Sequence, residues 1–353
     1  AYNACHPCPA ACFRELPVPR HLSCHLFAAA IATTAAGAVH AAGPTPDAQC
    51  ATLDKLAYPA ADRPSTAQQA ALASCDAPAL YYGIRQPRDV VKARHCAFTP
   101  DKDDDVFSKK AGVLMMLYAN GQGVARNLAL AKKAACAAGG APAELSGRLA
   151  HLDELAPGKR EAGKPIDFCD DITSGMMMGY CASLDAAQGD VKRERTLAAI
   201  AAQFKPNEQA AFSRLLNSLS RFVEARGGNE VDLGGTARGM LVAQEEDAQK
   251  DAFLAALQAF EHGKLPRFSA AQDQALDREL NTVYGQLRRL PVQEYTTIKM
   301  ADIQATQRIW LVYRDAWVEF GKLRYPAVPA HAWRAHFTQQ RTAMLKALLE
   351  ELS

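Results

Sequence analysis

Alanine-rich stretches recur along almost the whole chain, and they constrain its fold more than any other feature of the sequence. Alanine has the highest helix propensity, whereas β-branched and aromatic residues favour strands. Aromatic residues make up only 7% of the chain. We therefore expect an all-α protein, in which a short segment of helical-hairpin repeats is followed by one or more antiparallel helical bundle modules.

Length and charge narrow the class of protein. The chain has 353 residues, with 40 Lys+Arg against 38 Asp+Glu and 49% hydrophobic residues. This length suits two or three domains with cores of their own. The near-neutral balance lacks both the charge excess of a disordered chain and the basic surplus of a nucleic-acid-binding protein. We expect a globular protein that binds no nucleic acid.

An apolar run without charges, LFAAAIATTAAGAVHAA, occupies residues 26–42, after several basic residues and before a polar stretch. This order is typical of a secretory signal peptide, with cleavage after Ala41; the alternative is an alanine-rich soluble helix. We predict that residues 1–41 are a leader and signal peptide and that the protein is periplasmic or secreted. No other segment approaches the ~20 apolar residues of a membrane span, so we expect no stable membrane insertion after signal removal.

Six cysteines follow the predicted signal. In an exported chain an even number favours disulfide bonds, although some cysteines that stay free and buried are the alternative. Six cysteines allow fifteen connectivities, and our hypothesis is that sequence neighbours pair. The expected pairs are Cys50 with Cys75, Cys96 with Cys136, and Cys169 with Cys181.

Two similar stretches follow each other between residues 45 and 155. At an offset of 38 residues, Gly83 aligns with Gly121 and Asp89 with Asn127. A period near this value is typical of helical-hairpin repeats, whose units stack to bury their apolar faces. The second copy, MLYANGQGVARNLALAKKAACAAGG, resembles the Sel-one-like repeat family. For residues 42–155 this resemblance implies a protein-interaction scaffold.

A linker is predicted at residues 156–165, where proline, glycine and charges replace the apolar periodicity. Residues 166–262 then form a second helical region, with a helix that begins at Pro206 and ends at the Gly-Gly pair starting at Gly227. A further helix is predicted over residues 270–290, beginning with a capping-box pattern.

The last predicted helix pair consists of residues 270–290 and about 297–324. Apolar and hydrogen-bonding residues alternate on both at steps of three and four, which favours antiparallel packing of one on the other. We expect Trp310 between them and Asp277 close to Arg314. In an enzyme Asp277 would be a general acid or base, which requires a cleft and a tuned partner. We favour an ion pair that fixes the helix register.

These helices resemble the lysozyme-inhibitor LprI family over residues 263–353. In that family a D-x-x-L-N-x-x-Y helix precedes an A-x-Q-R-x-W-x-x-Y-R-D helix. Residues 166–181 look like the cysteine-bearing start of the same family, which makes 166–262 a diverged LprI-like region. Family members usually carry cysteines around these helices, whereas residues 182–353 contain none. The matching positions, interpreted as structural, are Asp277, Leu280, Asn281, Tyr284, Gln307, Arg308, Trp310, Arg314 and Asp315.

The resemblance implies an exported cell-envelope protein that binds a protein partner, with lysozyme inhibition as the named activity. Lysozymes are often basic, yet residues 265–353 hold twelve Lys+Arg and nine Asp+Glu, so this region offers no acidic surplus for steering. The alternatives are an envelope scaffold that acts through the repeats, and a cell-wall hydrolase, which needs a placed pair of carboxylates. We expect a binding protein and not an enzyme.

No motif indicates a cofactor or a metal site. His331 and His336 lie five residues apart, rather than the four that would place both on one helix face. Cys5, Cys8 and Cys12 have a spacing that suits a metal or iron–sulfur site, but they precede the removable signal. We expect neither a cofactor nor a metal.

Overall fold

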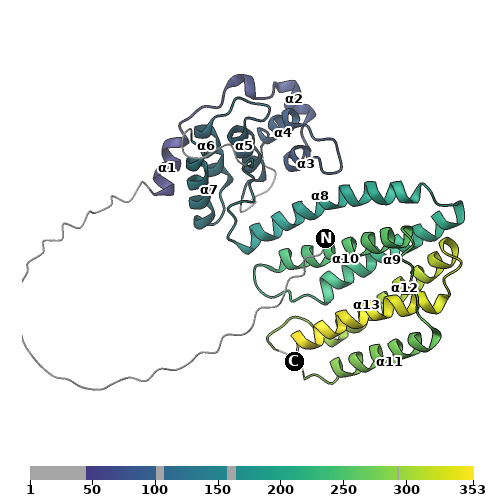
Figure 1. Cartoon of the computed structure of the whole chain (residues 1–353). Helices are drawn as coiled ribbons and strands as arrows, with labels where there is room; N and C mark the ends of the chain where they lie inside the picture. The colour runs from purple at the N-terminus through teal and green to yellow at the C-terminus, as the bar shows by residue number, and fades with distance from the viewer. Residues whose placement is uncertain (1–44, 101–106, 157–163, 292–293) are drawn as a thin grey trace, which may run out of the picture. The chain divides into compact units, whose positions relative to one another are not determined.

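The structure is a computed structural model that describes residues 45–100, 107–156, 164–291 and 294–353 (Figure 1). Within these residues every named element is helical, which confirms the expected all-α class. The earlier elements are α1 (Pro46–Leu53), η1 (Ala60–Asp62), α2 (Thr66–Ala71), α3 (Ala77–Tyr82), α4 (Val90–Ala97), α5 (Lys109–Asn120), α6 (Leu128–Ala138) and α7 (Pro142–Glu154). The later ones are α8 (Gly175–Ala201), α9 (Pro206–Asn229), α10 (Arg238–Glu261), α11 (Ala270–Leu287), α12 (Met300–Arg324) and α13 (Ala330–Glu351).

Two of the predicted segments fall outside this description. The leader and signal peptide, residues 1–41, lies outside the described residues, and so does most of the predicted linker at 156–165. Among the helices that the structure does describe, none is long and apolar enough to cross a membrane.

The hairpins α3–α4 and α5–α6 are built alike, 38 residues apart in the sequence. In each, a glycine with positive φ ends the first helix, a conformation that costs glycine little. An Asp or Asn side chain caps the second helix, and an arginine in the turn donates from Nε to a carbonyl at 2.9 Å. The equivalent residues are Gly83 and Gly121, Asp89 and Asn127, and Arg88 and Arg126.

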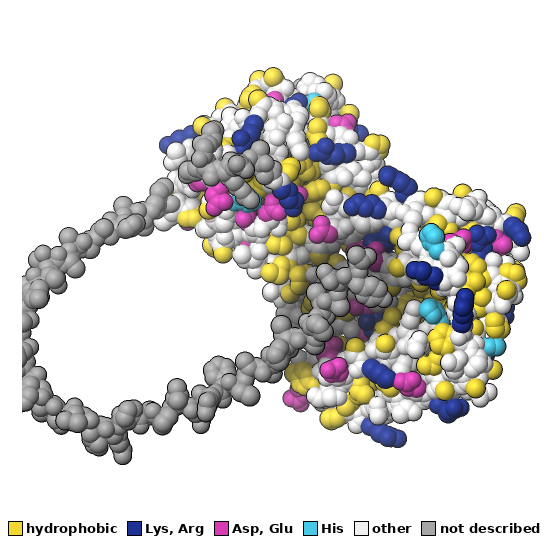
Figure 2. Space-filling view, viewed as in Figure 1, with side chains coloured by type: hydrophobic (Ala, Val, Ile, Leu, Met, Phe, Trp, Pro, Cys, Tyr) yellow, Lys and Arg dark blue, Asp and Glu magenta, His cyan; other side chains and the backbone are white. Residues whose placement is uncertain are grey.

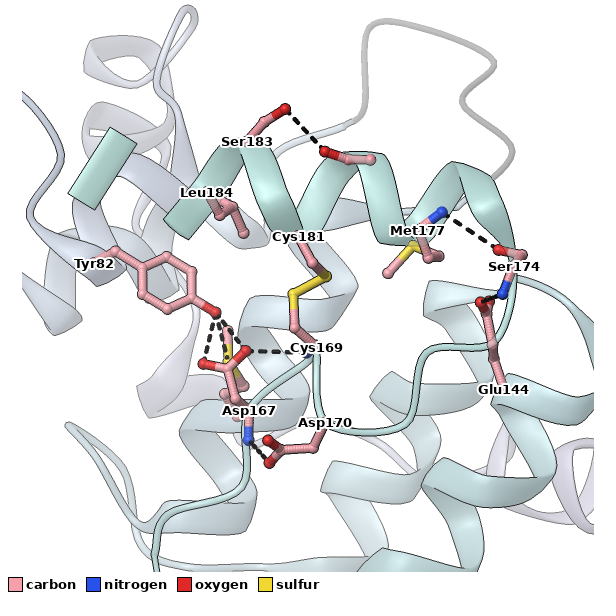
Figure 3. Close-up of a disulfide and its surroundings, with 12 residues drawn as sticks. Tyr82, Glu144, Asp167, Cys169, Asp170, Ser174, Met177, Cys181, Ser183 and Leu184 are labelled. Carbon is pink, nitrogen blue, oxygen red and sulfur yellow. Dashed lines mark hydrogen bonds between the residues drawn. A yellow bond between two sulfur atoms is a disulfide. The ribbon is translucent and has the colours of Figure 1, made fainter. Parts of the chain in front are cut away.

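A first core lies among α3 to α7 and includes Met115 and Leu117, both with no exposed surface. Residues 166–181, expected to start the second helical region, instead bury Ile166, Phe168, Met177 and Cys181 in this first core, whereas Met176 is 52% exposed. Figure 3 shows how the segment is held: Cys169 is joined to Cys181 of α8, and the Tyr82 hydroxyl of α3 donates to both carboxylate oxygens of Asp167, at 3.0 and 2.8 Å. The aromatic ring of Phe168 accounts for Gly112 in α5, because a Cβ there would lie 2.8 Å from the ring.

All six candidate cysteines form disulfides, but the neighbour-pairing hypothesis is wrong for four of them. Cys50 of α1 is bonded to Cys136 of α6, and Cys75 is bonded to Cys96 of α4. Only the third expected pair, which joins Cys169 to Cys181, is present. The reason is spatial, since α1 packs on α6 and α7 and brings Cys50 to a helix that is distant in the sequence.

A second core lies among α9 to α13 and the end of α8, and it contains all three tryptophans. Here α12 packs along α9, while α11 packs along α13. The predicted antiparallel pairing of residues 270–290 with 297–324 is therefore wrong. The apolar stripe of each helix was identified correctly, but a stripe does not specify which helix covers it.

Candidate functional site

The nine LprI-like motif positions divide into an inward and an outward set. Leu280 and Trp310 are buried in the second core, at 3% and 2% exposure. Tyr284 packs against that core and is partly buried. The outward members are exposed on α11 and α12, and they are Asp277, Asn281, Arg308 and Asp315.

Among the inward residues, Gln307 belongs to a buried ionic network. Its Oε1 accepts a hydrogen bond from Nε of Arg341 at 2.9 Å, and Arg341 in turn binds both carboxylate oxygens of Glu230. Arg226 also pairs with Glu230 and donates from Nε to Glu245 at 2.7 Å. The motif glutamine thus orients an arginine that joins α12, α13 and the end of α9.

The sequence reasoning missed this network. A signal was present in the i, i+4 spacing of Arg226 and Glu230, at which opposite charges stabilise each other on a helix, but the predicted helix ended before Glu230. Burial lowers the pKa of Arg226, but the carboxylates of Glu230 and Glu245 outweigh it and raise the pKa above its ordinary value. The cation is therefore retained inside the protein, where an unpaired charge would be costly.

Trp310 lies in the interior as expected, but its surroundings differ from the prediction. It lines a narrow hollow of about 30 Å³ together with Phe222 of α9, Phe253 of α10 and Phe337 of α13, and α11 contributes no residue to that lining. The guanidinium of Arg314 lies 5.2 Å from the centre of the indole. This distance is suitable for a cation–π contact.

The expected ion pair between Asp277 and Arg314 is not formed. Asp277 is exposed and accepts a hydrogen bond at 3.1 Å from Nδ2 of Asn281 on its own helix. Arg314 instead donates to Oδ1 of its neighbour Asp315, at 3.0 and 2.9 Å. The physical reason is the helix pairing, since α11 packs along α13, α12 packs along α9, and Asp277 stays exposed.

The outer face of α12 carries two exposed motif residues beside three exposed apolar side chains. We use this name for Arg308, Leu311, Val312, Asp315 and Leu323. The three apolar side chains are 38%, 59% and 40% exposed, in sequence order. Residues three and four apart lie on one side of a helix, so the two charged motif residues flank Leu311 and Val312. An apolar centre with a charged rim is the common arrangement of a protein-binding patch.

Elsewhere on the surface, charges of both signs are mixed. On the face shown in Figure 2, basic and acidic side chains are interspersed with apolar ones. Within the ranges that the structure describes, no group of three or more His, Cys, Asp or Glu residues could hold a metal ion.

Comparison with known proteins finds a likeness in the C-terminal helices. A family model described as "Lysozyme inhibitor LprI" matches residues 263–345, which span α11, α12 and most of α13. No curated protein and no solved structure matches the chain. The likeness predicted for the C-terminal helices is therefore confirmed for this segment.

Proposed function

We propose that this chain is an exported, protein-binding protein of the cell envelope and that it inhibits lysozyme by binding it through the outer face of α12. The observation that carries the proposal is the match of residues 263–345 to the lysozyme-inhibitor family. The outer face belongs to that matched segment and includes the motif residues Arg308 and Asp315.

The geometry favours binding over turnover. Gln307 and Trp310 are committed to the ionic network and to the second core, so these motif residues hold the helices together. What the motif leaves accessible is a helix surface, with Val312 as its most exposed apolar side chain at 59%. A surface of this kind buries apolar area against a partner, whereas catalysis requires a cleft that surrounds the reacting atoms.

The charge distribution suggests that residues 166–262, and not residues 265–353, attract a basic partner. Residues 265–353 have twelve Lys+Arg and nine Asp+Glu, whereas residues 166–262 have nine Lys+Arg and fifteen Asp+Glu. An acidic region beside the contact surface accelerates encounter with a basic protein. In this proposal the diverged region supplies that attraction and the LprI-like helices supply the contact.

Export is proposed from the signal-like residues 1–41 together with the three disulfide bonds, because disulfides persist in oxidising compartments. The intact mass of the protein recovered from the envelope fraction tests this. Loss of the first 41 residues with all six cysteines oxidised supports export, and a full-length reduced product contradicts it.

A scaffold acting through residues 42–155 is the second candidate. The shared caps and arginine bonds of the two hairpins favour it, since Sel-one-like repeats present interaction surfaces. We infer Sel-one-like membership from these equivalent positions and from the second copy's sequence.

Titration of lysozyme with the purified full chain separates these functions. Stoichiometric, reversible loss of lysozyme activity supports inhibition. Capture of an envelope partner that α3–α6 surface variants abolish, without any effect on lysozyme, supports the scaffold. Cleavage of peptidoglycan by the purified protein alone would contradict both binding functions.

A further inference from the structure

A cavity of about 380 Å³ lies between α8, α9 and α10, outside the segment that matches the family model. Its volume is in the range of small-ligand sites. The apolar part of the lining consists of Leu197, Leu216, Leu219, Val223 and Phe253. We call it the α8–α10 cavity.

The two basic residues that line the cavity are already neutralised. Arg193 donates to Asp251 at 2.7 Å and to Asp190 at 2.8 Å, and it also pairs with Asp247. Lys250 donates to the other oxygen of Asp190 at 3.0 Å. These bonds hold both cations in place, so neither is available to balance further negative charge.

Three carboxylates of the lining, those of Glu194, Glu224 and Glu246, are not neutralised in this way. In the described part of the chain none of them makes a hydrogen bond or an ion pair. Burial, with the nearby charges of Glu224 and Asp190, raises the pKa of Glu246 despite the attraction of Lys250. A positive charge placed beside these carboxylates would therefore be stabilised.

The position of Glu246 depends on a glycine. A Cβ added to Gly227 of α9 would lie 2.9 Å from Cγ and 3.1 Å from Oε1 of Glu246, so only glycine lets the side chain lie against α9. This contact explains why a glycine is tolerated inside the helix in spite of its low helix propensity. The close approach of the α9 backbone at Gly227 thus helps to place the Glu246 carboxylate in the cavity lining.

We propose that the α8–α10 cavity binds an alkylammonium group, with the aliphatic chain against the leucines and the ammonium group among the three unpaired glutamates. An apolar wall alone would accept any small apolar molecule, and the carboxylates alone would accept any cation. Together they select a molecule that has both parts. Two sources carry this chemistry, a free amine and the lysine side chain of a basic protein. The proposal stands independently of lysozyme inhibition.

Calorimetric titration of the full chain with n-hexylammonium chloride, hexan-1-ol and hexanoate tests the selectivity. We expect the ammonium ion to bind about tenfold more tightly than the alcohol and the hexanoate not to bind. Equal affinity for ammonium and alcohol would overturn the proposal, because the glutamates would then contribute nothing. Failure of the ammonium ion to bind would overturn it as well.

Two variants assign any binding to this cavity. Glu246→Gln should weaken hexylammonium binding about fivefold or more, and Glu319→Gln, on the exposed side of α12, should leave it unchanged. Leu216→Trp fills the cavity without removing a charge and should abolish binding. Wild-type affinity in both cavity variants, with normal circular dichroism spectra, would contradict the assignment. Competition of poly-L-lysine with hexylammonium would identify the lysine side chain of a protein as the source, and binding of hexylammonium that poly-L-lysine does not affect would identify a free amine.

Discussion

The carboxylate of Glu230 and the guanidinium of Arg341 form a two-point ion pair, with Oε2 to Nη1 at 2.8 Å and Oε1 to Nη2 at 2.5 Å. Both side chains are completely buried, although 111 residues separate them in the sequence. Removing one partner of such a pair leaves a charge in the interior with fewer bonds than it needs. The pair therefore links the end of α9 to α13.

Replacement of Arg341 should reveal this link. We expect Arg341→Met to lower the free energy of unfolding by about 3 kcal/mol, the lower end for a broken buried pair, because Arg226 still contacts Glu230. Arg308→Met, an exposed substitution of the same kind, should change it by less than about 0.5 kcal/mol. Tryptophan fluorescence during urea unfolding measures both, since all three tryptophans lie in the second core. Equal effects of the two variants would contradict the role of the pair.

Two glycines in the LprI-like helices should respond to alanine with opposite signs. A Cβ at Gly321 would lie 2.5 Å from Cε2 of the fully buried Trp333, so Gly321→Ala should destabilise by about 1 to 3 kcal/mol. A Cβ at Gly285 meets nothing within 4 Å, and Gly285→Ala should stabilise α11 by about 0.5 kcal/mol. Urea titrations followed by tryptophan fluorescence measure the change in the free energy of unfolding for both variants. A stabilising Gly321→Ala would mean that Trp333 is not packed as described.

The length of the loop that each disulfide closes predicts how much free energy of unfolding is lost with that bond. The Cys50–Cys136 bond closes 86 residues and the Cys75–Cys96 bond closes 21. On the chain-entropy account, loss of the first should cost about 4.6 kcal/mol and loss of the second about 3.3 kcal/mol. Peptide mapping without reduction checks the connectivity, and unfolding of the double serine variants checks the order. Recovery of a Cys50–Cys75 peptide would contradict the structure.

Glu144 should give the first core a dependence on pH. Burial raises its pKa, but hydrogen bonds from the amides of Ser174, Thr173 and Ala141 outweigh burial and hold the pKa below its ordinary value of 4.5. A carboxylate with a lowered folded-state pKa stabilises the protein above its unfolded-state pKa, and this contribution is lost as the pH falls through the folded-state value.

The variant Glu144→Gln isolates that contribution. At neutral pH it should cost about 1 to 3 kcal/mol, because an amide oxygen cannot replace both carboxylate oxygens as acceptors. The difference from the wild type should shrink as the pH falls below 4.5, the ordinary value for this group. The helical circular dichroism signal during unfolding measures it, with Glu154→Gln on the exposed side of α7 as the control. A difference that does not change with pH would contradict the assignment.

Local features of the fold could be predicted from the sequence, and long-range ones could not. The capping box at Ser269 begins α11 as predicted, since the bonds that define it join residues three apart. The predicted end of α9 at Gly227 was early, because the helix continues to Asn229. A glycine ends a helix only if the chain leaves the helical conformation there, and here the close approach of Glu246 requires a glycine within the helix.

The site illustrates the same limit. The motif spacing identified Trp310 as a core residue, because the apolar stripe of a helix is the side that faces the core. It gave the wrong partner for Arg314, since the partner depends on which helices pack together. Glu230 was missed altogether, because the arginine that binds it lies 111 residues away.

The central claim is that the outer face of α12 binds lysozyme, and calorimetric titration of lysozyme with three forms of the full chain tests it most directly. We predict one-to-one binding by the wild type and at least about tenfold weaker binding by Val312→Asp, which places a charge at the centre of the patch. Val91→Asp makes the same change at an apolar side chain of α4 that is 44% exposed, and it should bind like the wild type. Absence of binding by the wild type, or equal affinity of Val312→Asp and the wild type, would contradict the claim.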